Sequence, residues 1–368
     1  MDTLTHGLAG ALLARALPAP RDEETSGLLR RREAWTGFLT AMLPDLDVLP
    51  DPFSAVFYVT QHRGLTHSFV LLPLWAIAFG LLASLVPGRG ARLPFRTRLE
   101  RLTLVSFAGV SSHVLLDWVT SWGTMFFAPL SWERYTLDWL FIVDLFLSGL
   151  LVAGLLAVAV LSRRGDGPSR VAARAGALAA TAYVLLCGVL HGRAMADLER
   201  LAPPGAETLA AIPQPLSPGR WLLLAGDDRE VVSWHVRLWG KVEERAAPLP
   251  PGRVIDGFTR RRDLFLRQLS TLYQPPEAAR PDVVPRADGE LSNRALAIAL
   301  DGPFGRFARF PAVVATSRSG GVTEVLVRDL RFGSLPRDLD PFLYAVRFDV
   351  ASRVIFEGFP SPRWHDAR

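Results

Sequence analysis

Histidine and aspartate residues recur beside apolar segments in the first 144 residues of this chain. His62 and His67 flank Arg63 and directly precede the apolar run 69–86. Neutral imidazole is the commonest metal ligand, and it is a costly side chain to place in lipid. His113 and Asp117 lie four residues apart inside another apolar run, so a helix would place both on one face. These residue types and this spacing predict a metal site.

Several segments would have to supply such a site. A hard or borderline divalent ion takes nitrogen and oxygen ligands, and a catalytic site leaves positions open for water. Two ions about 3.5–4 Å apart would clamp a phosphoryl group, and His62, Asp47 and Asp144 are candidates to complete a second ion. The candidate metal ligands are His6, Asp45, His62, His67, His113 and Asp117. The candidate catalytic residues are Asp47 and Asp144 as bases and Arg63 as a bidentate phosphate contact.

Each of these residues also has a purely structural explanation. A structural explanation is least convincing for His113 and Asp117, because a buried carboxylate and imidazole inside an apolar span are costly without a role. The structural alternatives are a packed histidine for His6, helix termination for Asp45 and Asp47, a solvated loop for His62, a helix cap for His67 with Ser68, and an arginine partner for Asp144.

Apolar segments are the elements that must position these side chains. The chain has 368 residues, of which 49% are hydrophobic, and its mean hydropathy is +0.22. These values indicate a chain that is partly membrane-embedded and partly globular. The single cysteine, Cys187, excludes an internal disulfide. The segments are the short or re-entrant helices 4–17 and 35–43 and the longer runs 69–86, 102–122, 139–162 and 172–190.

Arginine positions predict an orientation for these segments. The net charge is +5, but many arginines lie in short loops between apolar runs, which is a membrane pattern and not a nucleic-acid groove. If six segments cross in succession, the arginine-rich loops 18–34, 87–101 and 163–174 share the cytoplasmic side. The opposite loops, 50–67 and 121–138, contain only two arginines, Arg63 and Arg134. The candidate site then faces the non-cytoplasmic side. Residues 1–6 lack a charged n-region, so we expect no cleaved signal peptide.

The composition changes after Leu190. Prolines at 203, 204, 213 and 215 indicate a linker, and later segments alternate between apolar and polar residues as strands do. The stretch 255–273 has a helical pattern. The predicted strands are 232–239, 322–327, 344–350 and 354–356. The predicted domains are a helical membrane domain at 1–195, a Pro-rich linker at 196–218 and a soluble β-rich domain at 219–368.

The blocks that contain the candidate residues resemble, in order, those of the YdjM-like inner-membrane family, which is described as metal-dependent hydrolases. The blocks are residues 1–6, 44–47, 62–68, 113–117 and 137–144. The resemblance covers about residues 1–150 and implies a protein of the bacterial inner membrane. The family is itself distantly similar to zinc-dependent phospholipase C and related single-strand nucleases, whose zinc ions sit on His and Asp from several helices. That remoter similarity implies phosphoester hydrolysis, carried by His6, Asp45, His67, His113 and Asp117.

We therefore expect an all-α polytopic membrane domain with a metal site between helices, followed by a smaller, mostly-β soluble domain. The expected function is hydrolysis of a phosphoester in a membrane lipid or lipid-linked substrate by metal-activated water. The expected cofactor is one or two divalent ions, zinc first and manganese second. We expect no nucleic-acid partner, and the sequence does not identify a protein partner. The alternative is a non-enzymatic membrane protein with a structural metal and a β domain that binds a partner in the envelope.

Overall fold

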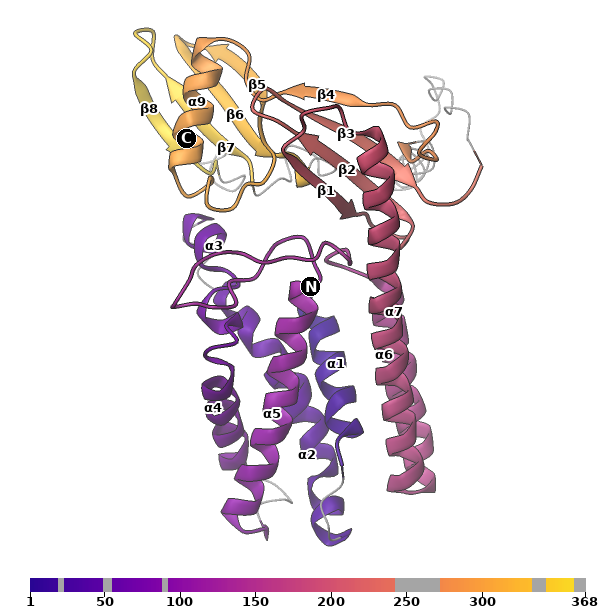
Figure 1. Cartoon of the computed structure of the whole chain (residues 1–368). Coiled ribbons are helices and arrows are strands. Elements are labelled where there is room, and N and C mark those ends of the chain that lie inside the picture. Colours follow the sequence, from indigo (N-terminus) through magenta and orange to yellow (C-terminus); the bar gives the residue numbers. More distant parts are fainter. Residues whose placement is uncertain (19–22, 49–54, 88–91, 242–271, 333–341, 361–368) are drawn as a thin grey trace, which may run out of the picture. The chain divides into compact units, whose positions relative to one another are not determined.

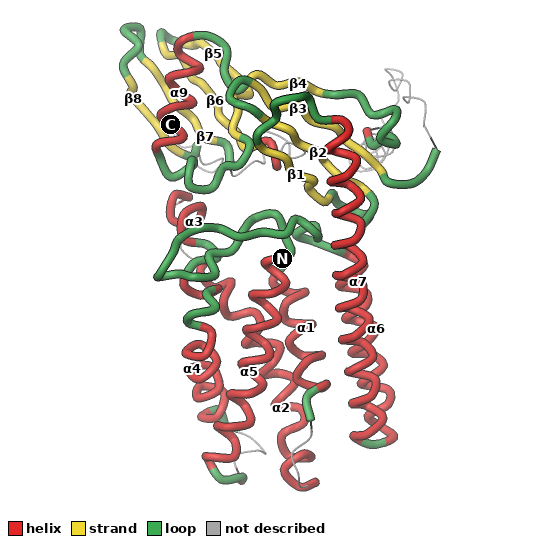
Figure 2. Tube along the Cα trace, viewed as in Figure 1, coloured by secondary structure: helices red, strands yellow, loops and turns green. Residues whose placement is uncertain are grey.

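A computed structural model describes residues 1–18, 23–48, 55–87, 92–241, 272–332 and 342–360. The chain divides into two compact units, Met1–Gly188 and Val189–Arg368. The first is helical and contains several apolar helices, and the second contains antiparallel sheets, as the sequence predicts (Figures 1 and 2). The predicted helical stretch at 255–273 lies outside the described residues except for its last two positions.

The first unit contains α-helices and short 3₁₀ turns, and its last helix, α7, continues into the second unit. In chain order they are α1 (Thr3–Ala16), α2 (Glu23–Met42), η1 (Leu43–Val48), α3 (Ala55–Gln61), η2 (Leu65–His67), α4 (Leu72–Leu85), α5 (Phe95–Trp118), α6 (Leu145–Leu161), η4 (Ser162–Arg164) and α7 (Asp166–Leu201). The predicted apolar segments each correspond to one helix, although the predicted run 69–86 becomes a helix only from Leu72. Pro73 lies at the start of α4, where a missing backbone N–H costs nothing.

Small residues let α1, α2 and α5 approach one another closely. A Cβ atom on Gly10 would lie 2.1 Å from the carbonyl oxygen of Gly37 in α2. A Cβ atom on Gly109 of α5 would lie 2.6 Å from the hydroxyl of Thr40. The backbones are therefore in direct contact, and the first turn of α1 is held beside the last turns of α5. The imidazole rings of His6 and His113 consequently stack, with centroids 3.7 Å apart.

The irregular segment 119–144 lies across the end of the helical unit at which α1 begins (Figure 2). It is tied to itself by paired backbone bonds between Thr124 and Tyr135. It is also tied to the loop around His62, because Met125 N–H donates to the carbonyl of Arg63 and the Arg134 guanidinium donates to the carbonyl of His62. This cover removes the loop's polar groups from solvent.

Arginines gather at the other end of the helical unit. Arg30 contacts Asp166 at 3.0 Å, and Arg170 and Arg174 donate to the last carbonyls of α1. The loops that the charge pattern places on one side therefore contribute to one end of the helices, and the histidine-bearing segments contribute to the other (Figure 1).

Among the described residues, two helices are long and apolar enough to cross a membrane. They are Leu145–Arg164 and Asp166–Leu201. Residues 56–67 and 72–85 together pass the same test as a pair bent by 80°, which raises the number to three if the pair is one broken span. The arginine count considered six segments that cross in succession, with the first expected to be short. The structure gives α1 only 14 residues, and α2 and α5 carry several charged residues each.

The second unit contains two four-stranded antiparallel sheets, in the orders β1-β2-β3-β4 and β5-β6-β7-β8. Trp221 and the inward side chains of β1 to β3 form one core with the end of α7, and α9 packs its apolar face on the second sheet. The predicted linker at 196–218 contains regular structure, namely the end of α7 and all of β1. The elements are β1 (Thr208–Pro213), β2 (Arg220–Gly226), β3 (Glu230–Arg237), β4 (Asp282–Pro285), α9 (Glu290–Asp301), β5 (Pro311–Ser319), β6 (Val322–Asp329), η5 (Leu330–Phe332), β7 (Tyr344–Phe348) and β8 (Val354–Gly358).

Candidate metal centre

Histidine and aspartate side chains from four segments meet in the interior of the helical unit. His6 lies in the first turn of α1, which begins where the Asp2 side chain accepts a bond from Thr5 N–H. Asp45 is in η1, His67 is in η2, and His113 and Asp117 are in the last two turns of α5. His6, Asp45, His113 and Asp117 each offer a ligand atom, and these atoms all lie within 4.8 Å of one another. The three histidines and Asp117 are completely buried.

His67 belongs to the same cluster. Its Nε2 lies 2.9 Å from His113 Nε2, 3.1 Å from Asp117 Oδ2 and 3.6 Å from Asp45 Oδ1. His113 Nε2 lies 3.3 Å from Asp117 Oδ2 and 3.5 Å from Asp45 Oδ1. Two imidazole nitrogens and two carboxylates therefore surround one point.

The outer nitrogens of these two rings fix which inner atoms carry protons. His113 Nδ1 lies 2.6 Å from the carbonyl oxygen of Ala41, which can only accept, so Nδ1 donates and Nε2 is left as a lone pair. His67 Nδ1 lies 2.8 Å from the Thr66 hydroxyl oxygen, and that hydroxyl donates to Asp47 at 2.8 Å. In the neutral form of the ring, His67 Nε2 is then a lone pair as well. Two lone pairs 2.9 Å apart repel each other unless a cation or a proton lies between them.

Two further buried atoms lack hydrogen-bond partners. They are His6 Nδ1 and Asp117 Oδ2. Leaving polar atoms unsatisfied in the interior is costly, and a bound ion would satisfy the carboxylate oxygen. The residues present thus fit a divalent cation: mixed nitrogen and oxygen donors, outer-shell partners that orient the rings, and an orphaned carboxylate atom.

Asp47 lies in the layer behind His67. It accepts bonds from the His62 ring at 2.7 Å, from Arg63 N–H at 3.1 Å and from the Thr66 hydroxyl at 2.8 Å. Burial alone would raise the pKa of Asp47, but the hydrogen bonds from His62 and His67 hold it below its usual range. Burial would likewise raise the pKa of Asp45, and the neighbouring imidazoles of His67 and His113 lower it. Both carboxylates are therefore ionised at neutral pH and can attract a cation.

The structure places His62 outside the four-residue group. Its ring stacks on Tyr58, with centroids 4.9 Å apart, and donates to Asp47. In this position His62 orients Asp47, and its direct role as a metal ligand stays a prediction. Its burial differs from the solvated loop that was the structural alternative, because segment 119–144 covers it.

Arg63 is buried against Asp117 and is not directed towards solvent. Its guanidinium lies 2.8 Å from Asp117 Oδ1 and donates to the Thr120 hydroxyl at 2.7 Å. The amino group of Met1 also contacts Oδ1 of Asp117. His6 Nε2 also lies 3.2 Å from Oδ1, whereas Oδ2 faces the imidazoles of His67 and His113. The backbone of Arg63 adopts a left-handed conformation with φ of 62°, which turns the chain between the two histidines.

Asp144 has a different environment. It caps the N-terminus of α6 by accepting a bond from Leu147 N–H at 2.8 Å, and it accepts another from the Tyr183 hydroxyl at 2.9 Å. Among the described residues it is not part of the four-residue group. A catalytic role for Asp144 stays a prediction, and its contacts are those of a helix cap.

Sequence reasoning did not find the hydroxyl and carbonyl groups that orient the cluster. Thr3 donates to Asp45 at 2.7 Å, Thr66 links His67 to Asp47, and Ala41 accepts from His113. Thr66 lies beside His67 in the sequence and offered a signal. The Ala41 carbonyl offered none, because it depends on the close contact between α2 and α5.

The fold and the site together define a class: a membrane protein with apolar helices and a buried His/Asp cluster that could bind a metal ion. Residues 1–194 match the family described as YdjM inner membrane protein, and the chain belongs to this family.

The chain is also similar to inner membrane protein YbcI of Escherichia coli (strain K12). It is 35% identical over 120 residues, which are 31% of this chain and 63% of that protein. The chain therefore matches about 63% of the relative's length. No solved structure matches this chain.

Proposed function

We propose that this protein is a membrane-bound, metal-dependent hydrolase that cleaves a phosphoester in a lipid or lipid-linked substrate. The observation that supports the proposal is the convergence of the Nε2 atoms of His67 and His113, 2.9 Å apart, on Asp45 and Asp117. Structural histidines satisfy their ring nitrogens with unlike partners, whereas two bare nitrogens directed at each other and at carboxylates suit a cation.

His6, Asp45, His67, His113 and Asp117 would hold the ion, and a zinc or manganese ion there would polarise a phosphoryl oxygen and acidify water. Asp47 and Thr66 keep His67 Nδ1 protonated and its ring oriented. Arg63 neutralises one oxygen of Asp117. These contacts support positioning roles for Asp47 and Arg63, and their direct participation as a base and a phosphate contact stays a prediction.

Exposed apolar side chains beside the cluster support a lipid substrate. Leu46 lies between Asp45 and Asp47 and is 52% exposed, and Leu65 precedes Thr66 and His67 and is 42% exposed. In a membrane protein, such residues suit contact with acyl chains or the head-group boundary. The substrate would approach along η1 and η2, where Asp45 and Asp47 retain some exposure.

The proposed orientation follows from the arginines. The arginine-rich end of the helical unit would be cytoplasmic, and the His/Asp end and the β-rich unit would be on the non-cytoplasmic side. An epitope or a cysteine label in unit 2 that reacts only in permeabilised spheroplasts would contradict this orientation.

A structural metal is the second candidate, and the complete burial of His6, His67, His113 and Asp117 favours it. A closed ligand set contributes folding energy and leaves no position for water. The two functions differ in turnover, because only the hydrolase releases a phosphorylated head group.

The test uses the full chain purified in detergent, loaded with zinc or manganese, and assayed for head-group release from phospholipid micelles. His67→Ala and His113→Ala should abolish release, whereas His191→Ala, which removes an imidazole packed on Trp221, should leave it intact. Turnover that persists in either cluster variant would refute the hydrolase assignment. Metal binding that stabilises the wild type, without hydrolysis of any lipid, would favour the structural metal.

A further inference from the structure

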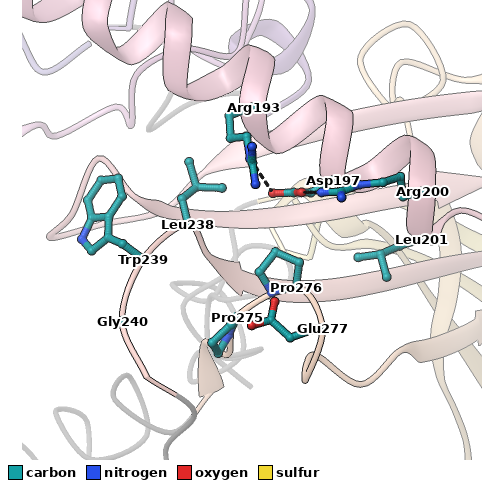
Figure 3. A pocket seen from close by; sticks show the side chains of 10 residues that line it. All are labelled: Arg193, Asp197, Arg200, Leu201, Leu238, Trp239, Gly240, Pro275, Pro276 and Glu277. Carbon is teal, nitrogen blue, oxygen red and sulfur yellow. Dashed lines mark hydrogen bonds and ion pairs between the residues drawn. The ribbon is translucent and has the colours of Figure 1, made fainter.

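A pocket of about 430 Å³ lies in the second unit, away from the residues of the candidate metal centre in the sequence (Figure 3). One wall is the end of α7, with Arg193, Asp197 and Arg200, and the opposite side carries Trp239, Pro275 and Glu277. Trp239 is 53% exposed. A Cβ atom on Gly219 would lie 2.4 Å from its indole, so the ring rests directly on backbone and is held in place.

Asp197 is the unusual residue of this pocket. It is 1% exposed, and its Oδ2 atom lacks a hydrogen-bond partner. Arg200 contacts Oδ1, and Arg193 Nε lies 3.6 Å from Oδ2, which is too long for a hydrogen bond (Figure 3). A buried carboxylate oxygen that lines a pocket and lacks a donor requires a ligand that can donate.

The two arginines supply the opposite charge. Arg193 and Arg200 are seven residues apart, two helical turns, so they lie on one face of α7 with Asp197 between them. Their side chains are 67% and 66% exposed. Asp197 holds both guanidiniums beside the pocket, and each retains N–H groups that can donate to a phosphate. The pocket thus offers a hydrogen-bond acceptor and a cation on each side of it.

The depth of the pocket follows from α7 itself, provided that α7 crosses the bilayer. The apolar run ends at Leu190, and Arg193 follows about 5 Å further along the helix. The head-group layer on each side of a bilayer is about 5–8 Å thick. Arg193 would therefore lie at the level of lipid phosphates. An exposed tryptophan is the typical companion at that level.

We propose that this pocket binds a zwitterionic phospholipid head group that carries a primary amine, as phosphatidylethanolamine does. The ammonium group donates to Asp197 Oδ2, with Glu277 nearby, and the phosphate accepts from Arg193 and Arg200. A quaternary amine has no N–H to donate, so choline lipids leave Oδ2 unsatisfied. A purely anionic lipid brings negative charge towards Asp197 without supplying a donor.

The experiment titrates the full chain in detergent with short-chain phosphatidylethanolamine, phosphatidylcholine and phosphatidylglycerol and counts bound lipid by native mass spectrometry. Wild type should prefer the ethanolamine lipid over the choline lipid by about tenfold or more, the effect of one charge-assisted hydrogen bond. Asp197→Asn should lose this preference and gain affinity for phosphatidylglycerol, and Asp197→Glu should restore the preference. The double variant Arg193→Gln with Arg200→Gln should weaken the binding of both the ethanolamine and the choline lipid about tenfold. Arg318→Gln, an exposed arginine of β5, is the control and should change nothing.

If Asp197 had only a structural role, its substitution would lower the affinity for all three lipids together and would not change their order of affinity. Equal binding of ethanolamine and choline lipids to wild type would overturn the proposal. Inorganic phosphate that competes as well as glycerophosphoethanolamine would also overturn it, because the site would then recognise only the anion. If glycerophosphoethanolamine binds but no lipid does, the proposal that the ligand is a membrane lipid would be overturned.

Discussion

Replacing Thr66 with valine removes one hydroxyl and keeps the volume of the side chain. In the wild type that hydroxyl accepts from His67 Nδ1 at 2.8 Å and donates to Asp47 Oδ2 at 2.8 Å. It therefore fixes both the tautomer and the orientation of the His67 ring. We expect the Thr66→Val protein to fold and to bind divalent metal more weakly, because His67 Nε2 loses the partner that keeps it available as a ligand.

The structure also sets the size of this effect. Outer-shell substitutions reduce metal affinity by about 10–100-fold. His67 Nδ1 lies 3.4 Å from Asp47 Oδ2, so the ring can approach Asp47 directly when the hydroxyl is lost. Thr66→Val should therefore fall near the lower limit, about tenfold. Asp47→Asn disturbs His62, Thr66 and His67 together and should approach about 100-fold.

The assay is competition for zinc between the purified protein and a chromophoric chelator. Thr60→Val is the matched control, because the Thr60 hydroxyl bonds only to carbonyls of its own helix α3 in the described contacts. This control should bind zinc as wild type does. Zinc affinity in Thr66→Val equal to that of Thr60→Val would refute the assignment of His67 as a ligand.

Three further perturbations test the fold and the charges around the site. Gly10→Ala places a Cβ against the backbone of α2 and should lower the free energy of unfolding by about 1–3 kcal/mol. Gly149→Ala is the control and should leave the free energy of unfolding unchanged, because no atom lies within 4 Å of the added Cβ. Equal melting temperatures of the two variants would contradict the close contact between α1 and α2. Arg63→Met leaves Asp117 buried without its guanidinium, so it should lose about 3–5 kcal/mol in chelator and less with bound metal, as chemical denaturation measures. Burial lowers the pKa of His235 below 6.5, so the unfolded chain binds the extra proton first. Stability of unit 2 is then complete above about pH 6.5 and falls at lower pH by at most about 1.4 kcal/mol per pH unit until the folded-state pKa is reached; hydrogen exchange in β2 and β3 should show this, and His235→Gln should remove it.

The sequence was most informative where chemistry and periodicity coincide. The four-residue spacing of His113 and Asp117 predicted one helical face, and in α5 their side chains lie 3.3 Å apart. The alternating stretches after Leu190 predicted β3 of the first sheet and β6, β7 and β8 of the second, because period-2 patterning is strong when one face is buried. Counting arginines by loop also placed the histidines at one end of the helical unit. The count succeeds without exact helix bounds because it uses only the order of the apolar segments and the loops between them.

What the sequence could not supply are the contacts between segments. Asp45 and Asp47 are two residues apart, yet Asp45 faces the cluster and Asp47 lies behind His67. Their side chains point in different directions because both residues are in the 3₁₀ turn η1. Arg63 has the chemistry of a phosphate ligand, but its left-handed backbone turns it towards Asp117. Asp144 has the typical position of an N-cap, before an apolar helix, and its proximity to the other motifs in the sequence concealed that explanation.

The central claim is that histidines and aspartates from α1, η1, η2 and α5 share a divalent cation. Anomalous scattering from crystals of the full chain, collected on both sides of the zinc edge, tests it most directly. We expect a zinc peak between His67 Nε2 and His113 Nε2, bordered by Asp45 and Asp117, that disappears in His113→Ala. Zinc-treated crystals with no anomalous peak among these side chains, or with peaks only at surface residues, would contradict it.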